Sequence, residues 1–216
     1  YGAKMAKRKA KQASTGKKPG GKPPKRPQTG PQAEDQINLT DEDSRIMKVA
    51  GGGFEQCYNA QAVVDTESML VVAPHITTAG NDKEQVAPML ECIQALPDGL
   101  NQPTRLLADT GFYSERNVQH CHDAGVEPLI AVGRDAHHLD WRSRFEEPAP
   151  LATPTSHVEQ MKHALKTQAG RAAYALRKQT VEPVFGIIKS VMGFRQFLLR
   201  GVGNVRNEWT LVCLAW

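Results

Sequence analysis

The chain of 216 residues is long enough for one domain with a hydrophobic core and too short for two full α/β domains. The net charge of +4 conceals an asymmetry: the first 30 residues hold ten lysines and arginines and no acid, which leaves −6 on the other 186. Hydrophobic residues make up 40% of the sequence, but no apolar run approaches the roughly 20 residues of a membrane-spanning helix, so we expect no membrane contact.

The cysteines are too widely spaced to indicate a shared role. There are four, with no pair in a Cys-x-x-Cys arrangement: Cys57, Cys92, Cys121 and Cys213. This spacing indicates neither a disulfide scaffold nor a cysteine zinc site. It favours a reducing, intracellular compartment.

Residues 1–36 are rich in Lys, Pro, Gly and Gln. Such a segment has too little apolar surface to offset the entropy of ordering, so we predict that it is disordered. Its clustered cations are suited to binding phosphates, but a solvated linker has the same composition. Composition alone leaves both interpretations open. The remaining residues, 37–216, are expected to form the ordered domain.

The ordered part begins with a predicted β-hairpin. Residues 56–65 and 69–77 are rich in β-branched and aromatic residues, and a short polar turn separates them. Asn81 and Asp82 then stand where the cap of a helix is expected. The predicted helix has apolar residues at helical spacing, namely Val86, Met89, Leu90, Ile93 and Leu96.

A strand–helix–strand pattern follows. Residues 105–108 are a short apolar strand, Ser114 opens a helix that runs to about residue 123, and residues 127–132 form another strand. Short links of this kind indicate a parallel βαβ unit. Placed beside the hairpin, the unit predicts a mixed sheet flanked by helices, which is an α/β fold.

The C-terminal third is predicted to be mainly helical. Residues 133–155 are irregular, with charges and prolines but no clear period. Ser156 begins a capping-box pattern, and a longer helix is expected after Gly170. Pro183 lies inside that pattern, so the helix either kinks there or restarts. Residues 209–216 indicate a final helix.

Two acidic residues stand in unusual surroundings. Asp109 directly follows an apolar strand, at the sheet edge where α/β folds place ligand sites, although Asp also caps turns in such positions. Glu182 lies among apolar neighbours on a helix, with Lys189 two turns further on, although a solvent-facing ladder of ion pairs has the same spacing. Carboxylates that converge supply the oxygen ligands that Mg²⁺ prefers.

Four sequence segments resemble the catalytic part of bacterial insertion-sequence DDE transposases. Their order along the chain is that of the family, and they are Tyr-Asn-Ala-Gln-Ala-Val-Val-Asp at 58–65, Ala-Asp-Thr-Gly-Phe-Tyr-Ser-Glu at 108–115, Arg-Lys-Gln-Thr-Val-Glu-Pro-Val-Phe-Gly-Ile-Ile-Lys at 177–189, and Gly-Phe-Arg-Gln-Phe-Leu-Leu-Arg-Gly at 193–201. The resemblance implies an RNase H-like α/β fold and DNA transposition by metal-dependent strand cleavage and transfer at the ends of the element.

The family uses two Asp and one Glu to hold two divalent ions, Mg²⁺ or Mn²⁺. By resemblance, Asp109 matches the second acid and Glu182 the third, so both are expected to be catalytic metal ligands. Tyr174, Arg177 and Lys189 resemble the DNA-binding members of the signature around that Glu, although four residues separate Arg177 from Glu182 where three are usual. Arg offers bidentate contacts to phosphates, and Lys offers a point charge.

The first acid of the family pattern has no clear match. In the family it lies on the strand before the one that contains Tyr58, within an Asp-Gly-Thr-like motif. Asp41, Asp43 and Asp65 are candidates by position only, because none ends an apolar strand before Tyr58. We therefore expect the first strand and its acid to lie upstream of residue 1. The chain is then the C-terminal part of a longer transposase, inactive alone, with residues 1–36 an internal loop of the whole protein.

The resemblance also implies partners and a location. The expected partner is double-stranded DNA, both element ends and target, and the full-length protein is expected to be a homodimer. A bacterial, cytoplasmic and nucleoid-associated protein is expected.

Two other functions compete with this interpretation. Asp109-Thr110-Gly111 matches the active-site triplet of aspartic proteases, but those enzymes are all-β, and their fold does not account for Glu182. The stronger alternative is a non-catalytic DNA-binding remnant that acts through residues 1–36. Mg²⁺ binding that depends on Asp109 and Glu182 would distinguish the transposase from the remnant.

Overall fold

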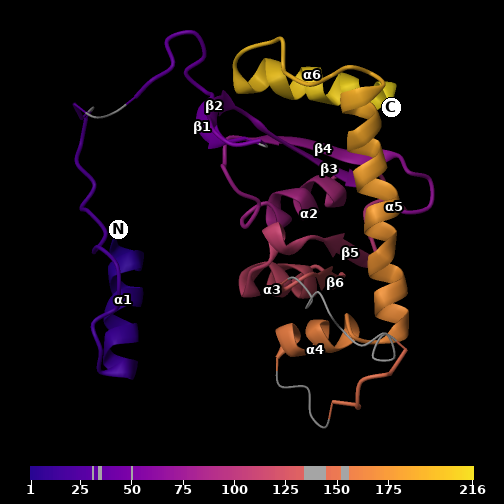
Figure 1. Ribbon diagram of the computed structural model, residues 1–216, viewed down its shortest axis with the longest axis horizontal. Coiled ribbons are helices and arrows are strands. Elements are labelled where there is room, and N and C mark those ends of the chain that lie inside the picture. The colour runs from indigo at the N-terminus through magenta and orange to yellow at the C-terminus, as the bar shows by residue number, and fades with distance from the viewer. Residues whose placement is uncertain (31, 34–35, 50, 134–144, 152–155) are drawn as a thin grey trace. The chain divides into compact units, whose positions relative to one another are not determined.

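The computed structural model describes residues 1–216 except 31, 34–35, 50, 134–144 and 152–155 (Figure 1). Most of the segment expected to be irregular, 133–155, therefore lies outside the described residues. The described residues group into two compact units, Tyr1–Ile37 and Asn38–Trp216. Within the described residues, no helix is long and apolar enough to cross a membrane.

The first unit contains one helix, α1 (Gly2–Thr15), in the segment where the sequence predicts disorder. None of the residues of α1 is buried. The guanidinium of Arg8 donates to the backbone carbonyls of Pro19, Gly20 and Gly21, at 2.9–3.2 Å. The helix thus rests on local hydrogen bonds rather than on a core, and disorder of residues 1–36 in solution stays a prediction.

Two antiparallel hairpins open the second unit. β1 (Arg45–Lys48) pairs with β2 (Phe54–Cys57), and β3 (Asn59–Val64) pairs with β4 (Val71–Thr77). The β3–β4 pair confirms the predicted hairpin. The β1–β2 pair is not apparent from the sequence, because most of its residues are exposed and give no clean apolar alternation.

The predicted parallel βαβ unit is also present. β5 (Arg105–Ala108) pairs in parallel with β6 (Glu127–Ile130), and α3 (Glu115–Asp123) connects them. The hydroxyl of Ser114 accepts from the backbone N–H of Asn117, which confirms Ser114 as the helix cap. The mixed α/β class is therefore confirmed. The predicted single mixed sheet is not what the structure has: the described strands form three separate two-stranded sheets.

The cap predicted for the next helix is wrong. α2 (Val86–Gln94) begins after Gln85, and no side chain caps it. The carboxylate of Asp82 accepts instead from the side-chain amides of Asn59, at 2.8 Å, and Gln61, at 2.7 Å. These amides on β3 compete for the carboxylate, and they hold it against the sheet rather than at the helix end.

Three helices complete the second unit, α4 (His157–Ala164), α5 (Gln168–Ser190) and α6 (Val202–Ala215). Ser156 caps α4 as predicted, and Thr167 caps α5. α5 continues through Pro183, so of the two predicted alternatives, a kink or a restart, the restart does not occur. α6 begins earlier than the sequence indicates.

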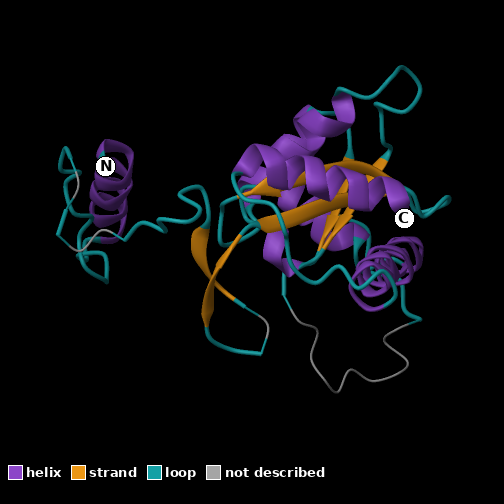
Figure 2. Ribbon diagram, turned by 90° about the horizontal axis from the view of Figure 1, so that it is seen from above, coloured by secondary structure: helices purple, strands orange, loops and turns teal. Residues whose placement is uncertain are grey.

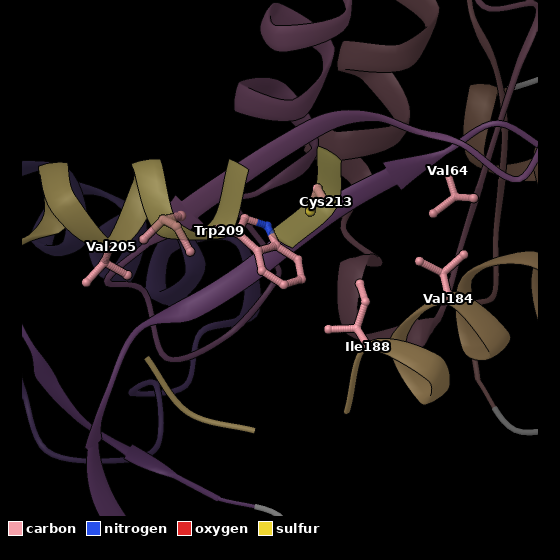
Figure 3. Close-up of a cluster of buried hydrophobic side chains, with 7 residues drawn as sticks. Val64, Val184, Ile188, Val205, Trp209 and Cys213 are labelled. Carbon is pink, nitrogen blue, oxygen red and sulfur yellow. The ribbon is translucent and has the colours of Figure 1, made fainter. Parts of the chain in front are cut away.

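One buried hydrophobic cluster joins α5 and α6 to the β3–β4 sheet. Its fully or nearly buried members are Val64, Ile76, Val184, Ile188, Val205, Trp209 and Cys213. In Figure 3, Val184 of α5 lies near Val64 of β3, and Ile188 of α5 lies between Val184 and Trp209 of α6. The indole N–H of Trp209 donates to the backbone carbonyl of Gln61 at 2.8 Å.

A second cluster covers the other face of the same sheet. It joins Ala73 of β4 to residues of α2 and α3, and Val63 packs against it, whereas Val64 belongs to the first cluster. Because neighbouring residues of a strand point to opposite faces, α2 and α5 lie on opposite faces of the β3–β4 sheet. Figure 2 shows strands with helices on both sides. All four cysteines are free thiols.

Candidate functional site

A cavity of about 290 Å³ lies where β3, β5, α2 and α5 meet. All six residues of β3 and all four of β5 line it, together with Asp82 and Asp109. A cavity over the face of a strand would be lined by alternate residues, because alternate side chains point the same way. This cavity therefore runs along the edges of the two strands.

Asp109 lies at the C-terminal end of β5, where the sequence places it. It is exposed, and its carboxylate Oδ1 accepts from the backbone N–H of Gly111 at 2.8 Å. This contact makes Asp109 the cap of a short 3₁₀ turn over Thr110–Phe112. The alternative role that the sequence leaves open for Asp109, that of a turn cap, is thus confirmed. One carboxylate oxygen makes this contact, so capping does not by itself prevent ligand binding by the other.

Asp82 is the acidic residue that the sequence analysis missed. A Cβ placed on Gly111 would lie 3.0 Å from Oδ1 of Asp109 and 3.5 Å from Oδ2 of Asp82, so the two carboxylates flank Gly111. The amides of Asn59 and Gln61 orient Asp82 toward this position. The polar residues on an otherwise apolar strand were the available signal, since buried amides require partners.

Glu182 lies outside the lining of the cavity. Its side chain is 55% exposed, and its carboxylate accepts from Nη2 of Arg177 at 3.1 Å. The Arg177 side chain is only 18% exposed and does line the cavity, with the Tyr174 ring 5.8 Å from its Cζ. Tyr174, Arg177 and Glu182 are therefore a connected set on α5.

Lys189 lies further along the same helix. Its Nζ is 5.7 Å from the ring centroid of Phe185, which lines the cavity. The sequence-predicted residues thus fall into two groups, Asp109 at the end of β5 and the signature residues on α5. Whether Asp109 and Glu182 share a metal ion stays a prediction.

The three positional candidates for the first acid make contacts at other places. The carboxylate of Asp41 accepts from the hydroxyl of Tyr58 at 2.7 Å and from the N–H of Gly201 at 3.3 Å. Asp43 accepts from the N–H of Val202 at 2.9 Å, so both acids lie at the N-terminus of α6. Asp65 accepts from Ser68 within the turn between β3 and β4. None of the three lines the cavity.

Hydrogen bonds lower the pKa of two of these acids, Asp41 and Asp65. Desolvation tends to raise the pKa of Asp41, but the bonds from Tyr58 and the backbone outweigh it and hold that pKa below its ordinary value. The hydroxyl and the N–H of Ser68 lower the pKa of Asp65. Both carboxylates are therefore charged at neutral pH and already bonded within the fold.

The donors at the cavity suit a hard divalent ion only in part. Asp82 and Asp109 offer carboxylate oxygens, the ligands that Mg²⁺ and Mn²⁺ prefer. Across the described residues, however, no three Asp, Glu, His or Cys side chains lie close enough to hold a metal together. The residues present fit part of a metal site and need at least one more ligand.

Comparison with known proteins gives one family. Residues 25–216 match the family model described as "Transposase DDE domain". No curated protein and no solved structure matches the chain significantly. The matched range includes Asp109, Glu182 and every element of the second unit.

Proposed function

Because the chain belongs to the transposase DDE domain family, whose members cleave and transfer DNA, we propose that it serves the transposition of a bacterial insertion sequence. Its substrates in this proposal are the ends of the element and the target duplex. The proposal includes an RNase H-like arrangement of the α/β fold. The observation that carries it is Asp109 at the end of β5, beside a cavity that Arg177 of α5 also lines.

Asp109 and Glu182 are the proposed metal ligands. Divalent ions held by such carboxylates activate an attacking oxygen and stabilise a leaving oxygen at phosphorus. Arg177, Lys189 and Tyr174 are proposed to hold DNA phosphates near α5. Substrate phosphate would draw Arg177 away from Glu182, because one guanidinium can pair with either anion.

Within this proposal, the chain is the C-terminal part of a longer transposase. Asp41, Asp43 and Asp65 are bonded within the fold away from the cavity, which supports a first acid supplied from outside these residues. The 216 residues alone are then expected to bind metal and DNA without cleaving strands. A homodimer is proposed for the full-length protein.

One observation favours a second function, that of a DNA-binding remnant. α1 buries no residue, so its lysines are available to phosphates whether or not the second unit is competent. DNA binding of this kind depends strongly on salt and needs no divalent ion. The two functions therefore differ in the role of Asp109 and Glu182.

Titration of Mg²⁺ by calorimetry separates the two functions. We expect Asp109→Asn and Glu182→Gln each to weaken Mg²⁺ binding by about tenfold or more, since each removes a charged ligand. The matched controls are Asp98→Asn and Glu91→Gln, exposed acids outside the cavity, which should bind as the unchanged chain does.

The same variants are then tested for binding to a fluorescent DNA duplex. If the chain is a DNA-binding remnant, all four variants should keep its salt-dependent DNA affinity. The unchanged chain should then bind Mg²⁺ no more strongly than Asp109→Asn and Glu182→Gln do. Equal Mg²⁺ affinity in Asp109→Asn, Glu182→Gln and the controls would contradict the transposase site.

A further inference from the structure

The loop that joins α5 to α6 contains residues 193–201, a segment that takes no part in the cavity or in the signature on α5 (Figure 1). Around it, residues 183–207 hold four cations and no acid, namely Lys189, Arg195, Arg200 and Arg206. This is a second concentration of positive charge, in the part of the chain whose net charge is −6. A local cluster of lysines and arginines is the usual electrostatic sign of a nucleic-acid surface.

Two phenylalanines fasten the loop to the core. The rings of Phe194 and Phe197 meet edge to face with centroids 5.4 Å apart, and they lie 6.3 Å and 6.4 Å from the Trp209 ring. Phe197 also meets Tyr58 edge to face at 6.2 Å. The loop is thus held by its aromatic side chains, while residues 195, 196 and 198–200 are exposed.

Acids from other parts of the chain hold the backbone of the loop. The carboxylate of Glu208 on α6 accepts from the backbone N–H of Leu198 at 2.9 Å and from that of Leu199 at 3.0 Å. The N–H of Gly201 donates to Asp41 at 3.3 Å. Because the fold already orders this loop, a partner that binds it pays little for ordering.

The loop presents two leucines between two arginines. Leu198 is 75% exposed and Leu199 is 50% exposed, and neither belongs to a described hydrophobic cluster. Single exposed apolar residues are ordinary, but two neighbouring leucines on an ordered loop form an apolar tip. The exposed guanidiniums of Arg195 and Arg200 form no ion pair within the described part of the chain, so they are available to an anionic partner.

We propose that residues 195–200 are a minor-groove wedge for duplex DNA. Leu198 and Leu199 enter between base pairs from the minor groove, and Arg195 and Arg200 hold the flanking phosphates. Apolar side chains inserted in this way unstack a base step and kink the duplex. The choice of DNA as partner rests on the proposed function, whereas the wedge itself rests on this loop.

The wedge acts at a distance from the proposed metal site. A helix rises about 1.5 Å per residue, so Lys189 lies about 18 Å from Arg177 along α5, and the loop begins about one turn further on. At about 3.4 Å per base pair, a duplex that runs along α5 is kinked about five or more base pairs from the phosphates held at Arg177. The kink therefore bends DNA away from the reacting strand rather than at it.

A protein partner suits the loop less well. Two leucines supply a small part of the roughly 800 Å² that each side of a stable protein interface buries. Burial of Arg195 and Arg200 beside them would also require acids on the partner, since unpaired buried charges are costly. DNA supplies negative charge on both sides of its minor groove.

The test uses the whole 216-residue chain and a short duplex with a central TA step, because such steps kink readily. 2-Aminopurine replaces the adenine of that step, and its fluorescence rises when the base is unstacked. Distamycin, a ligand that fills the minor groove, serves as the competitor. Residues 1–36 are present in every variant, so their own DNA binding does not distinguish one variant from another.

Two double variants separate the leucines from the arginines. The first combines Leu198→Ala with Leu199→Ala, and its matched control is Leu100→Ala, at a position 67% exposed after α2. The second combines Arg195→Gln with Arg200→Gln, and its matched control is Arg116→Gln, an exposed position on α3. Circular dichroism verifies that all four proteins are folded.

We expect the unchanged chain to raise the fluorescence, the leucine double variant to lose most of the rise, and distamycin to suppress it. The leucine double variant should keep the slope of log affinity against log salt, because its phosphate contacts remain. The arginine double variant should lose about two units of that slope, at about 0.9 per phosphate contact. Both matched controls should behave as the unchanged chain does.

The wedge is overturned if the unchanged chain gives no rise, if the leucine double variant keeps it, or if distamycin leaves it unaltered. Dimers that form in sedimentation without DNA, and that the leucine double variant loses, would assign the leucines to a second copy instead. If the wedge fails while Asp109-dependent Mg²⁺ binding is found, the loop is wrong and the proposed function stands. Unstacking that depends on the leucines, without Mg²⁺ binding that depends on Asp109, rejects the metal site and leaves the wedge.

Discussion

The acids around Gly111 illustrate how far single residues can be interpreted from sequence. Asp109 was identifiable because an acid directly after a short apolar strand falls at the edge of a sheet. Asp82 was not, since its position before α2 suits a helix cap equally well. Only the pairing of β3 and β4 brings the amides of Asn59 and Gln61 to its carboxylate. Side-chain partners across a sheet depend on register, which local sequence does not contain.

The bond between Tyr58 and Asp41 gives a prediction at this scale. Tyr58→Phe should destabilise the chain by about 1 kcal/mol at pH 7, because it removes a hydrogen bond to a charged group. The pKa of Asp41 is lowered in the folded state, so its contribution is present above the unfolded value of 3.8 and is lost as pH falls through the folded value. Urea unfolding at pH 7 and pH 3 measures this.

The stability difference between Tyr58→Phe and the unchanged chain should therefore shrink at pH 3. Tyr113→Phe is the control, and it should change stability little at either pH. A difference for Tyr58→Phe that is the same at both pH values would show that the carboxylate is not the partner that matters.

Elements with strong local patterns were predicted well. The β3–β4 hairpin and the βαβ unit of β5, α3 and β6 appear where the sequence places them, because their apolar residues recur at strand or helix spacing. The β1–β2 hairpin was missed because exposed strands need no such pattern. α6 was predicted too short, since its first turn is held by Asp43 from a distant part of the chain.

The junction of α4 and α5 gives a prediction at the scale of elements. Gly170 is buried, and a Cβ there would overlap the backbone carbonyl of Ala164. Gly170→Ala should therefore destabilise the chain by about 1–3 kcal/mol. Gly186→Ala, in the same helix with open space around it, should instead stabilise by about 0.5–1 kcal/mol.

Urea denaturation of both glycine variants checks these opposite signs. Their contrast separates the steric effect at Gly170 from the general preference of helices for Ala over Gly. Equal changes in stability would mean that the helices are not packed closely at Gly170.

α1 gives a second prediction of this kind. Its cations Lys4, Lys7, Arg8 and Lys11 stand three and four residues apart, so like charges oppose the helix. DNA phosphates should relieve this repulsion and raise the helix content seen by circular dichroism at low salt. Replacing Lys4, Lys7 and Lys11 with Gln, while Arg8 keeps its hydrogen bonds to the backbone carbonyls of residues 19–21, should raise helicity without DNA and reduce the gain on adding it.

The variant with three Gln should also lose about two to three units from the slope of log affinity against log salt, at about 0.9 per lost phosphate contact. An unchanged slope would exclude α1 from the DNA interface.

For the second unit as a whole, the α/β class was predictable but the joining of its sheets was not. The sequence indicates one mixed sheet, whereas among the described residues β3 pairs only with β4 and β5 only with β6. Short-range patterns specify strands and their turns, but the order of strands in a sheet depends on contacts between distant segments.

The central claim is that Asp109 anchors the metal of a transposase site. Paramagnetic broadening by substoichiometric Mn²⁺ in the amide NMR spectrum of the ¹⁵N-labelled chain tests it most directly. The account predicts that the signals of Asp109–Gly111 lose intensity first, and that Asp109→Asn removes this loss while Asp98→Asn does not. Broadening centred elsewhere in the chain, or an unchanged pattern in Asp109→Asn, would contradict it.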